Sequence, residues 1–319
     1  MLFAPTIHLL LALAGSAVAV ANLPTQILYQ SPIGLFLENI AVRPSSGKLL
    51  LTSVLSPTLH TFDTAAENAT LDEVYTFPNA TALTGITEYR PDVYAVVASE
   101  LNVSTISAAP GSIAIWSVDF TSGAPIPKIA ARLPRSTLTN GLSTAPGRPD
   151  IVLAADSDLG AAYEINMHTG AVRVLIQNAA LAPGAPPPAL GINGLHPHGG
   201  SLYFTNSALN TFGRVPLSGG APEVLGSLPP AAGSGYDDFT FDAEGRAWVA
   251  THPGSVQLFY ALKNGTWVQE TAAGNVTGST VFQGPTSAAF GRCGGKEKIL
   301  YVTTAGGQVI AVDTSSIKN

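Results

Sequence analysis

The chain has 319 residues, of which 46% are hydrophobic and only 11% are charged, and its formal net charge is −6. This much apolar sequence excludes an intrinsically disordered protein, which lacks the residues to bury a core. The acidic balance, with no run of Lys or Arg longer than a pair, disfavours a nucleic-acid-binding protein, because such proteins need clustered basic residues to displace counterions. We therefore expect a globular protein that does not bind nucleic acid.

Residues 1–19 have the features of a secretory signal peptide. An apolar stretch from Ile7 to Ala14 is followed by small residues up to Ala19, and it is shorter than the roughly 20 residues that span a bilayer. No Lys or Arg precedes the stretch, which leaves a buried N-terminal strand as the alternative. We predict a signal peptide over 1–19, one domain over 22–319, secretion of the protein and no interaction with a membrane.

Five Asn-x-Ser/Thr sequons and a lone cysteine are consistent with a secretory route. Sequons are the attachment sites of N-linked glycans in secreted proteins. Because Cys293 is the only cysteine, the chain can form no internal disulfide, and its stability must rest on a large core. The predicted glycosylation sites are Asn68, Asn79, Asn102, Asn264 and Asn275.

Short β-rich runs recur along the chain between turns, and the turns draw on 32 Gly and 24 Pro. Each run has the usual length of a strand, and no sustained 3.6-residue periodicity after the N-terminal segment predicts a helix. In chain order these runs cover residues 48–54, 92–98, 151–155, 201–205, 246–251 and 299–304.

A shorter apolar segment that begins with a polar residue precedes each run. These polar residues are spaced by 46, 56, 53, 44 and 49 residues, the period of a propeller blade. A third strand follows in most units, and residues 26–29 are expected to add the outer strand of the last blade. The sequence therefore predicts an all-β, six-bladed β-propeller rather than an irregular two-sheet sandwich. The six polar positions are Glu38, Thr84, Asn140, Asn193, Asp237 and Thr286.

The first strand of each propeller blade lines the central channel, so polar residues at equivalent positions converge on the axis. Glu38 and Asp237 with Asn140 and Asn193 offer four oxygen ligands of the kind that Ca²⁺ prefers. A cation held there could polarise a carbonyl or lower the pKa of a bound water. The alternative for each residue is an ordinary turn hydrogen bond, and Asp238 could replace Asp237 if a bulge shifts the strand.

Several of these residues stand in the pattern of a known family. Glu38 lies ten residues before Lys48, Asn140 and the Asn193-Gly-Leu segment match two family asparagines, and residues 237–245 match its Asp segment. In this pattern the chain resembles the regucalcin/gluconolactonase-like propellers over nearly all of its length after the N-terminal segment. The resemblance implies the six-bladed fold and one divalent cation on Glu38, Asn140, Asn193 and Asp237.

Two departures from that family concern the substrate. Leu138 stands where family members that act on sugar lactones carry an Arg, and residues 38–42 lack the aromatic of the family's opening segment. A site without a charged anchor favours a less polar ligand. We therefore expect a small apolar ligand and rank a sugar lactonase lower.

Residues 38–44, 191–195 and 248–253 resemble a secreted fungal branch of this superfamily that includes hetero-Diels–Alderases of tropolone-sesquiterpenoid biosynthesis. The resemblance implies a catalyst that holds an apolar quinone methide and an alkene in near-attack geometry and donates a hydrogen bond to a carbonyl oxygen. We name Asp237, Asn193 and His252 as catalytic candidates, although a packed or exposed loop histidine is the alternative for His252. His196 and His198 are expected on a surface turn.

Three functions remain open, in this order. The first is a pericyclase of secondary metabolism that resembles the hetero-Diels–Alderases. The second is a lactone or ester hydrolase that depends on a divalent metal, and the third is a non-catalytic propeller that binds a ligand. We expect a monomer with no organic cofactor and with one divalent cation at most.

Overall fold

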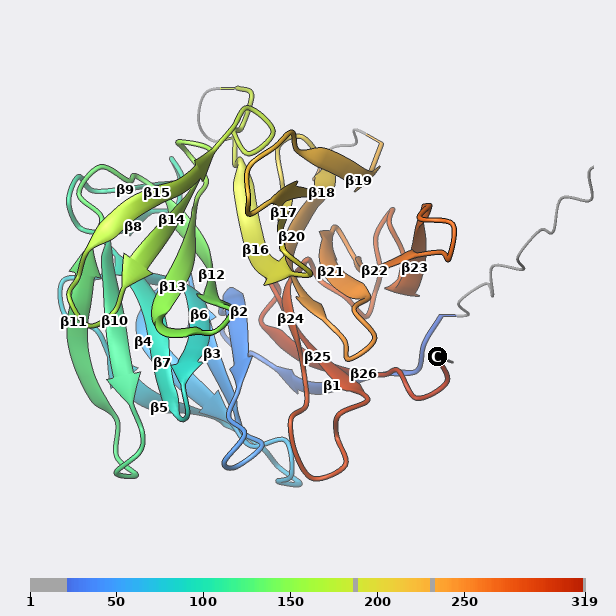
Figure 1. Cartoon of the computed structure of the whole chain (residues 1–319). Helices are drawn as coiled ribbons and strands as arrows, with labels where there is room; N and C mark the ends of the chain where they lie inside the picture. The colour runs from blue at the N-terminus through green and yellow to red at the C-terminus, as the bar shows by residue number, and fades with distance from the viewer. Residues whose placement is uncertain (1–21, 186–188, 230–232, 318–319) are drawn as a thin grey trace, which may run out of the picture.

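The computed structural model describes residues 22–185, 189–229 and 233–317, and within these ranges it contains strands and turns but no helix. Six four-stranded antiparallel sheets surround a central axis (Figure 1), and β8 (Leu101–Asn102) pairs separately with β9 (Ser107–Ala108). The predicted all-β, six-bladed propeller is confirmed. The signal peptide predicted at 1–19 lies outside the described residues, and no helix in the described part is long and apolar enough to cross a membrane.

Each blade runs from an inner strand at the axis to an outer strand at the periphery. The first three blades, each from the axis outward, are β2 (Leu37–Val42), β3 (Leu49–Ser53), β4 (Ser56–Phe62) and β5 (Leu71–Thr76); β6 (Ala82–Arg90), β7 (Val93–Ser99), β10 (Ala114–Asp119) and β11 (Ile126–Arg132); and β12 (Thr139–Ala145), β13 (Arg148–Asp156), β14 (Ala161–Asn166) and β15 (Val172–Gln177). The last three are β16 (Ile192–His198), β17 (Ser201–Asn206), β18 (Thr211–Pro216) and β19 (Glu223–Ser227); β20 (Gly235–Phe241), β21 (Ala247–His252), β22 (Ser255–Ala261) and β23 (Trp267–Gly274); and β24 (Pro285–Phe290), β25 (Ile299–Thr304), β26 (Gln308–Asp313) and β1 (Thr25–Gln30).

The N-terminal strand closes the ring. β1 pairs antiparallel with β26, with Gln26 opposite Ala311 and Tyr29 opposite Val309. The sixth blade is thus built from both ends of the described chain, as the run at 26–29 predicted. Because the ends of the ring are joined by a strand ladder, opening it requires the loss of backbone hydrogen bonds and of packed apolar surface together.

The hydrophobic core lies between neighbouring blades rather than at the axis. Between the second and third blades, Ile115 and Val97 pack with Val152 and Ile165. Between the fourth and fifth, Phe212 packs edge-on against Phe239, with ring centroids 5.1 Å apart. These inter-blade layers hold a chain whose lone cysteine, Cys293, forms no disulfide.

All six inner strands carry one extra residue at the same level. In β20 the pairing passes from Tyr236 opposite Thr251 to Phe239 opposite Val249, so three steps on the inner strand match two on its neighbour. The other inner strands show the same irregularity at their predicted polar residue. Such β-bulges re-aim side chains next to functional sites. Here the bulge allows two successive residues of one strand to reach the channel.

The second residue of the bulge is glycine in three consecutive blades because neighbouring inner strands approach too closely for a side chain. A Cβ on Gly85 would lie 2.3 Å from the carbonyl oxygen of Asn140, and one on Gly141 would lie 2.6 Å from that of Asn193. In the fourth blade a Cβ on Gly194 would lie 2.3 Å from Asp238 Oδ1. Side chains at this level therefore come only from the other three blades.

Replacing Gly85 with alanine is expected to lower the free energy of unfolding by about 3 kcal/mol, because two backbone segments would have to move apart. The matched control is Gly235→Ala, whose Cβ would meet nothing closer than 3.6 Å. Urea unfolding followed by circular dichroism measures both changes. Equal stabilities of the two variants would contradict this account of the channel packing.

The five predicted glycosylation sites are all exposed in the structure, as attachment of a glycan requires. They lie on or beside turns at both ends of the propeller rather than in an inner strand. Occupation of these sites and secretion of the protein stay predictions.

Candidate functional site

The four predicted ligand residues meet at the channel axis. We call the end of the channel where the inner strands begin the N-end, and the end where they finish the C-end. Glu38, Asn140, Asn193 and Asp237 come from four different inner strands and are between 2% and 8% exposed. Asn140 lies close enough to the Glu38 carboxyl to lower its pKa, and Asn193 does the same to the pKa of Asp237. The structure therefore brings together the residues that the repeat aligned.

The two threonines of the same alignment connect the blades to one another. The Oγ1 of Thr84 donates to the carbonyl oxygen of Thr139 at 2.8 Å, and that of Thr286 donates to the carbonyl oxygen of Leu37 at 2.7 Å. Each bond joins an inner strand to the next inner strand round the axis. Thr84 and Thr286 therefore hold neighbouring inner strands together, whereas the side chains at the other four positions face one another.

Carboxyl groups are concentrated at this level of the channel. Burial raises the pKa of Glu38 well above its usual range, and the nearby carboxylates of Asp237 and Asp238 raise it further. Burial also raises the pKa of Asp237, although the hydrogen bond and charge of His252 oppose that rise. A positive charge placed among these groups would be stabilised by all three carboxyls.

The donor set fits a divalent cation. The Oδ1 atoms of Asn140 and Asn193 are buried and have no hydrogen-bond partner, which costs about 1–3 kcal/mol for each atom. Two such oxygens beside the carboxyls of Glu38 and Asp237 form an all-oxygen set of the kind hard cations take. A cation here would need the amide oxygens as ligands, because the described residues contain no group of three or more His, Cys, Asp or Glu that could hold a metal ion.

His252 is the accessible member of the predicted catalytic group. It ends β21 at the N-end, its side chain is 28% exposed, and its Nε2 lies 3.1 Å from Asp237 Oδ2. Asn193 lowers the pKa of Asp237 and donates to Ser207 Oγ at 3.0 Å. The predicted trio is therefore contiguous, and its catalytic role stays a prediction.

A second polar layer, formed by Asn39, Asp238 and Ser287, lies one residue further along the bulged strands and was not predicted from the sequence. Asp238 Oδ2 accepts hydrogen bonds from Asn39 Nδ2 at 3.0 Å and from Ser287 Oγ at 3.2 Å. Its Oδ1 accepts the backbone N–H of Phe239 at 2.8 Å. Asp238 thus does not replace Asp237, because the bulge allows both to face the channel. In the sequence, the adjacent acidic residues Asp237 and Asp238 were the signal that could have indicated this second layer.

The prediction of a surface turn was wrong for His196, whereas His198 is exposed but ends the strand just before the turn at residues 199–200. β16 continues through His198, and His196 points inward with Nε2 3.3 Å from Asp238 Oδ1. Its ring lies edge-on to Phe239, with centroids 4.7 Å apart. The strand extends this far because residues 196–198 pair with Ser201–Tyr203 of β17.

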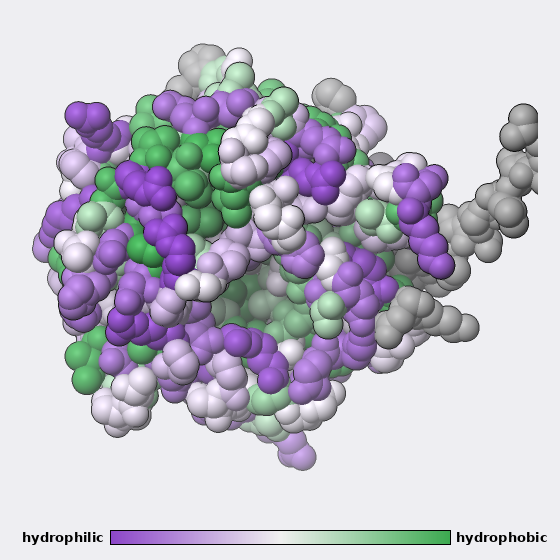
Figure 2. Space-filling view, in the orientation of Figure 1, coloured by the Kyte–Doolittle hydropathy of each residue, from purple (hydrophilic) through white to green (hydrophobic). Residues whose placement is uncertain are grey.

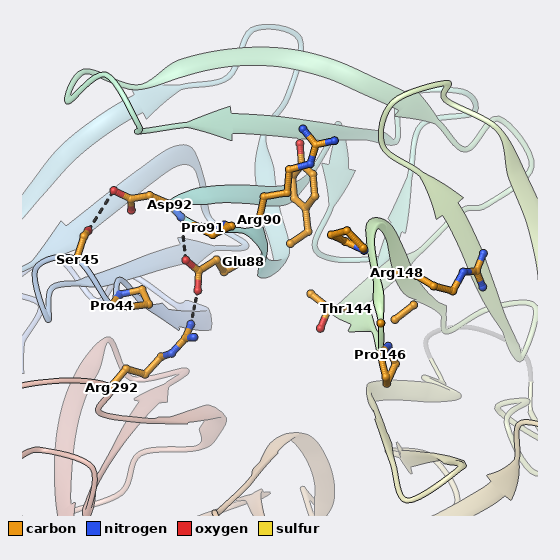
Figure 3. Close-up of a pocket in the computed structure, with 14 residues that line it drawn as sticks. Pro44, Ser45, Glu88, Arg90, Pro91, Asp92, Thr144, Pro146, Arg148 and Arg292 are labelled. Atoms are coloured by element: carbon orange, nitrogen blue, oxygen red, sulfur yellow. Dashed lines mark hydrogen bonds and ion pairs between the residues drawn. The ribbon is translucent and has the colours of Figure 1, made fainter.

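Two adjoining cavities open at the C-end. A central cavity of about 410 Å³ lies among the ends of the inner strands, and a side groove of about 670 Å³ lies between the second and third blades (Figures 2 and 3). They share Glu88, Thr144 and Arg292. Figure 3 shows Glu88 held between the backbone of Asp92 and the guanidinium of Arg292.

The ion pair beside the groove gives a pH-dependent prediction. Arg43 donates to both carboxylate oxygens of Asp92, at 2.9 and 2.7 Å, and lowers the pKa of that carboxyl. A lowered pKa contributes stability that is present above the unfolded value of 3.8 and is lost as pH falls through the folded value. Asp92→Asn is therefore expected to cost about 1 kcal/mol near neutral pH and nothing at strongly acidic pH.

Urea unfolding near neutral pH and in strongly acidic solution tests this expectation. The exposed Glu67 provides the control variant Glu67→Gln, which should match the wild type at both values. The expectation would be contradicted if the free energy of unfolding lost in Asp92→Asn became larger as the pH was lowered.

Exposed apolar side chains surround the N-end. Six large apolar residues stand exposed on turns at this end: four between the second and third strands of the first four blades, and two on the connections that lead into the first and sixth blades. This apolar rim consists of Ile33, Leu55, Val103, Leu159, Leu209 and Val276.

Two curated proteins are similar to this chain over most of its length, while no protein-family model matches it. One is named "Putative hetero-Diels-Alderase asR5", from Sarocladium schorii, with 29% identity covering 91% of this chain and 80% of the relative. The other is named "Putative hetero-Diels-Alderase", from Phoma sp, with 27% identity covering 88% and 86%. Both names agree with the fungal branch indicated by the sequence.

Solved structures with the same fold include a calcium-binding regucalcin from Agrobacterium tumefaciens, with a TM-score of 0.60 and 20% identity over 92% of this chain and 95% of that one. A gluconolactonase from Xanthomonas campestris has a TM-score of 0.61 and 13% identity over 94% and 92%. At these identities the likeness concerns the fold alone. The chain thus shares the six-bladed propeller fold of these structures, and in sequence it is similar to the two fungal proteins named as hetero-Diels-Alderases.

Proposed function

We propose that the protein catalyses a hetero-Diels–Alder cycloaddition between an apolar quinone methide and an alkene, of the tropolone-sesquiterpenoid type, at the N-end of its channel. The names of the two similar proteins support the reaction class. The observation that carries the proposal for this chain is the pairing, at one end, of an apolar rim with buried hydrogen-bonding groups. Such a combination suits an apolar substrate with one polar atom.

The reaction needs little covalent chemistry from the protein. The carbonyl oxygen and the exocyclic carbon of the quinone methide bond to the two alkene carbons, so one C–O and one C–C bond form and no group leaves. Catalysis then consists of holding the partners in near-attack geometry and stabilising negative charge on the carbonyl oxygen. The apolar rim would supply the first requirement by binding the hydrocarbon parts of both substrates.

The predicted trio would supply the second requirement. His252 is the exposed member, and it would donate a hydrogen bond to the carbonyl oxygen. Asp237 would orient the imidazole through its contact with Nε2, and Asn193 lies close enough to Asp237 to lower the pKa of that carboxyl. When bound, a divalent cation would polarise the same kind of oxygen, and Glu38, Asn140, Asn193 and Asp237 are the residues that would hold it.

The enantiomeric composition of the product tests this function. A quinone methide is generated in the presence of an apolar trisubstituted alkene, with and without protein, and the cycloadduct is resolved by chiral chromatography. Without protein the reaction gives a racemate, and with the wild type we expect an excess of one enantiomer that His252→Ala reduces. A racemic product from folded wild-type protein at every concentration would count against the proposal.

A metal-dependent lactone or ester hydrolase is the second candidate, because the unpartnered oxygens of Asn140 and Asn193 fit a cation and a bound cation can lower the pKa of water. At a hundredfold excess over its dissociation constant, Ca²⁺ is expected to raise the free energy of unfolding by about 2.7 kcal/mol. Glu38→Gln, which removes one carboxylate, should lose most of that gain. An unchanged thermal midpoint of the wild type across a calcium titration would argue against a cation site.

A further inference from the structure

We infer that Ser207 is a positioning residue of the N-end site, which holds the Asn193 amide with its nitrogen toward the serine and its oxygen available to a cation. The inference rests on the proposed function, because Asn193 belongs both to the predicted trio and to the residues that would hold a cation. Ser207 is the first residue after β17, at the same end of the channel as His252. It is partly exposed there, whereas Asn193 is 2% exposed.

Ser207 occupies the place in the fourth blade that His252 occupies in the fifth. In each blade the second strand pairs with the residue that precedes the polar position of the inner strand, and Ser207 and His252 come directly after that pair. Each contacts the polar residue of its own inner strand. His252 Nε2 lies 3.1 Å from Asp237 Oδ2, and Asn193 Nδ2 lies 3.0 Å from Ser207 Oγ. The repeat that places His252 against Asp237 therefore places Ser207 against Asn193.

The hydrogen bonds of Ser207 determine which atom of the amide faces it. A serine hydroxyl has one hydrogen to donate and two lone pairs that accept. The hydrogen is donated to the carbonyl oxygen of Tyr236 at 2.7 Å, so toward Asn193 the same Oγ can only accept. Asn193 must therefore present Nδ2, because a reversed amide would bring its oxygen against a lone pair of Ser207 Oγ.

This orientation leaves an acceptor oxygen buried without a partner. Asn193 Oδ1 makes no hydrogen bond, which is an unfavourable state for a buried polar atom. The orientation is therefore held from the nitrogen side of the amide, by Ser207 and by the carboxyl of Asp237, whose pKa Asn193 lowers. An amide oxygen that is kept unpartnered beside carboxyl groups is preorganised as a ligand of a hard cation.

Ser157 occupies the equivalent place in the third blade and provides the comparison. Its buried Oγ donates to the carbonyl oxygen of Ile192 at 2.6 Å, the counterpart of the bond from Ser207 to Tyr236. Removing this hydroxyl breaks the same kind of bond between neighbouring blades, one residue before Asn193, but leaves Ser207 against the amide. Ser157→Ala thus separates the loss of a strand contact from the loss of the amide's partner.

Hydrogen exchange of the side-chain amide measures its restraint without any ligand. In protein made with isotope-labelled asparagine, the Asn193 amide resonance is assigned by its loss in Asn193→Asp. Its protons should exchange with water about tenfold faster in Ser207→Ala than in the wild type, as the loss of one hydrogen bond implies. Ser207→Thr keeps the hydroxyl at this partly exposed position and should keep the wild-type rate, as should Ser157→Ala. Circular dichroism confirms that each variant is folded.

Calorimetric titration of the full chain with Ca²⁺ tests the consequence for the site. Ser207→Ala should bind Ca²⁺ at least about tenfold more weakly than the wild type, the usual cost of removing an outer partner of a metal ligand, while Ser207→Thr and Ser157→Ala should bind it like the wild type. The inference is overturned if Ser207→Ala keeps the wild-type exchange rate, or if it binds Ca²⁺ as tightly as Ser157→Ala does. A wild type that binds no Ca²⁺ and gives a racemic cycloadduct would instead count against the proposed function, and the exchange rates would then decide the role of Ser207.

Discussion

Asp237→Asn is expected to lower the initial rate of cycloaddition by at least about a hundredfold, the usual cost of losing one preorganised electrostatic group. The substitution keeps the size of the side chain but removes the charge that faces His252 Nε2 at 3.1 Å. An imidazole without this partner is less firmly oriented as a hydrogen-bond donor. The readouts are the initial rate and the enantiomeric excess of the cycloadduct.

The control for this loss is Asp242→Asn, which changes an acid on the same blade that bonds to Trp248 and Arg246 instead of facing the channel. It should keep the enantiomeric excess of the wild type. If Asp237→Asn retained both rate and selectivity, the N-end trio would not be the catalytic group and the channel site would have to be reassigned.

Asp238→Ala should lower the free energy of unfolding by about 3 kcal/mol, a loss typical of breaking a buried charged network. Asp238 is 4% exposed, and its carboxylate accepts hydrogen bonds from Asn39 and Ser287, so it joins the first, fifth and sixth blades. Removal would leave the buried Nδ2 of Asn39 without its acceptor. Chemical denaturation measures the change.

The exposed Glu297 provides the comparison, because Glu297→Ala removes an acid from the surface and should shift stability by no more than about 0.5 kcal/mol. A loss in Asp238→Ala no larger than in this control would mean that the second polar layer contributes little to holding the blades together. The expected order of stability is wild type, then Glu297→Ala close to it, then Asp238→Ala well below.

The fold could be predicted from the sequence because every blade repeats the same local pattern. Polar residues such as Glu38 and Asn193 open inner strands at a blade-like period, and a β-rich run follows each of them. Local strand length and turn chemistry fix this pattern, and six repeats reinforce one another. The closing pair of β1 and β26 could be predicted for the same reason, since one blade lacked its outer strand.

The positions of Glu38, Asn140, Asn193 and Asp237 could be predicted from that alignment, but the second polar layer could not. Asp238 and Asn39 reach the channel only because each inner strand bulges by one residue, and a bulge depends on how closely the neighbouring strands approach. The inward position of His196 depends on the pairing of β16 beyond Leu195, across a proline that suggested a turn. The cavities at the C-end depend on side chains from several blades, which no single repeat encodes.

The most direct test of the central claim is a side-by-side assay of the purified wild type on two substrates. The protein is given the quinone methide with an apolar alkene and, separately, a panel of small lactones and esters, each before and after treatment with a chelator and with the bound metal measured. The account predicts an enantiomerically enriched cycloadduct and no hydrolysis. Chelator-sensitive hydrolysis together with a racemic cycloadduct would contradict it and would assign the channel to a metal-dependent hydrolase.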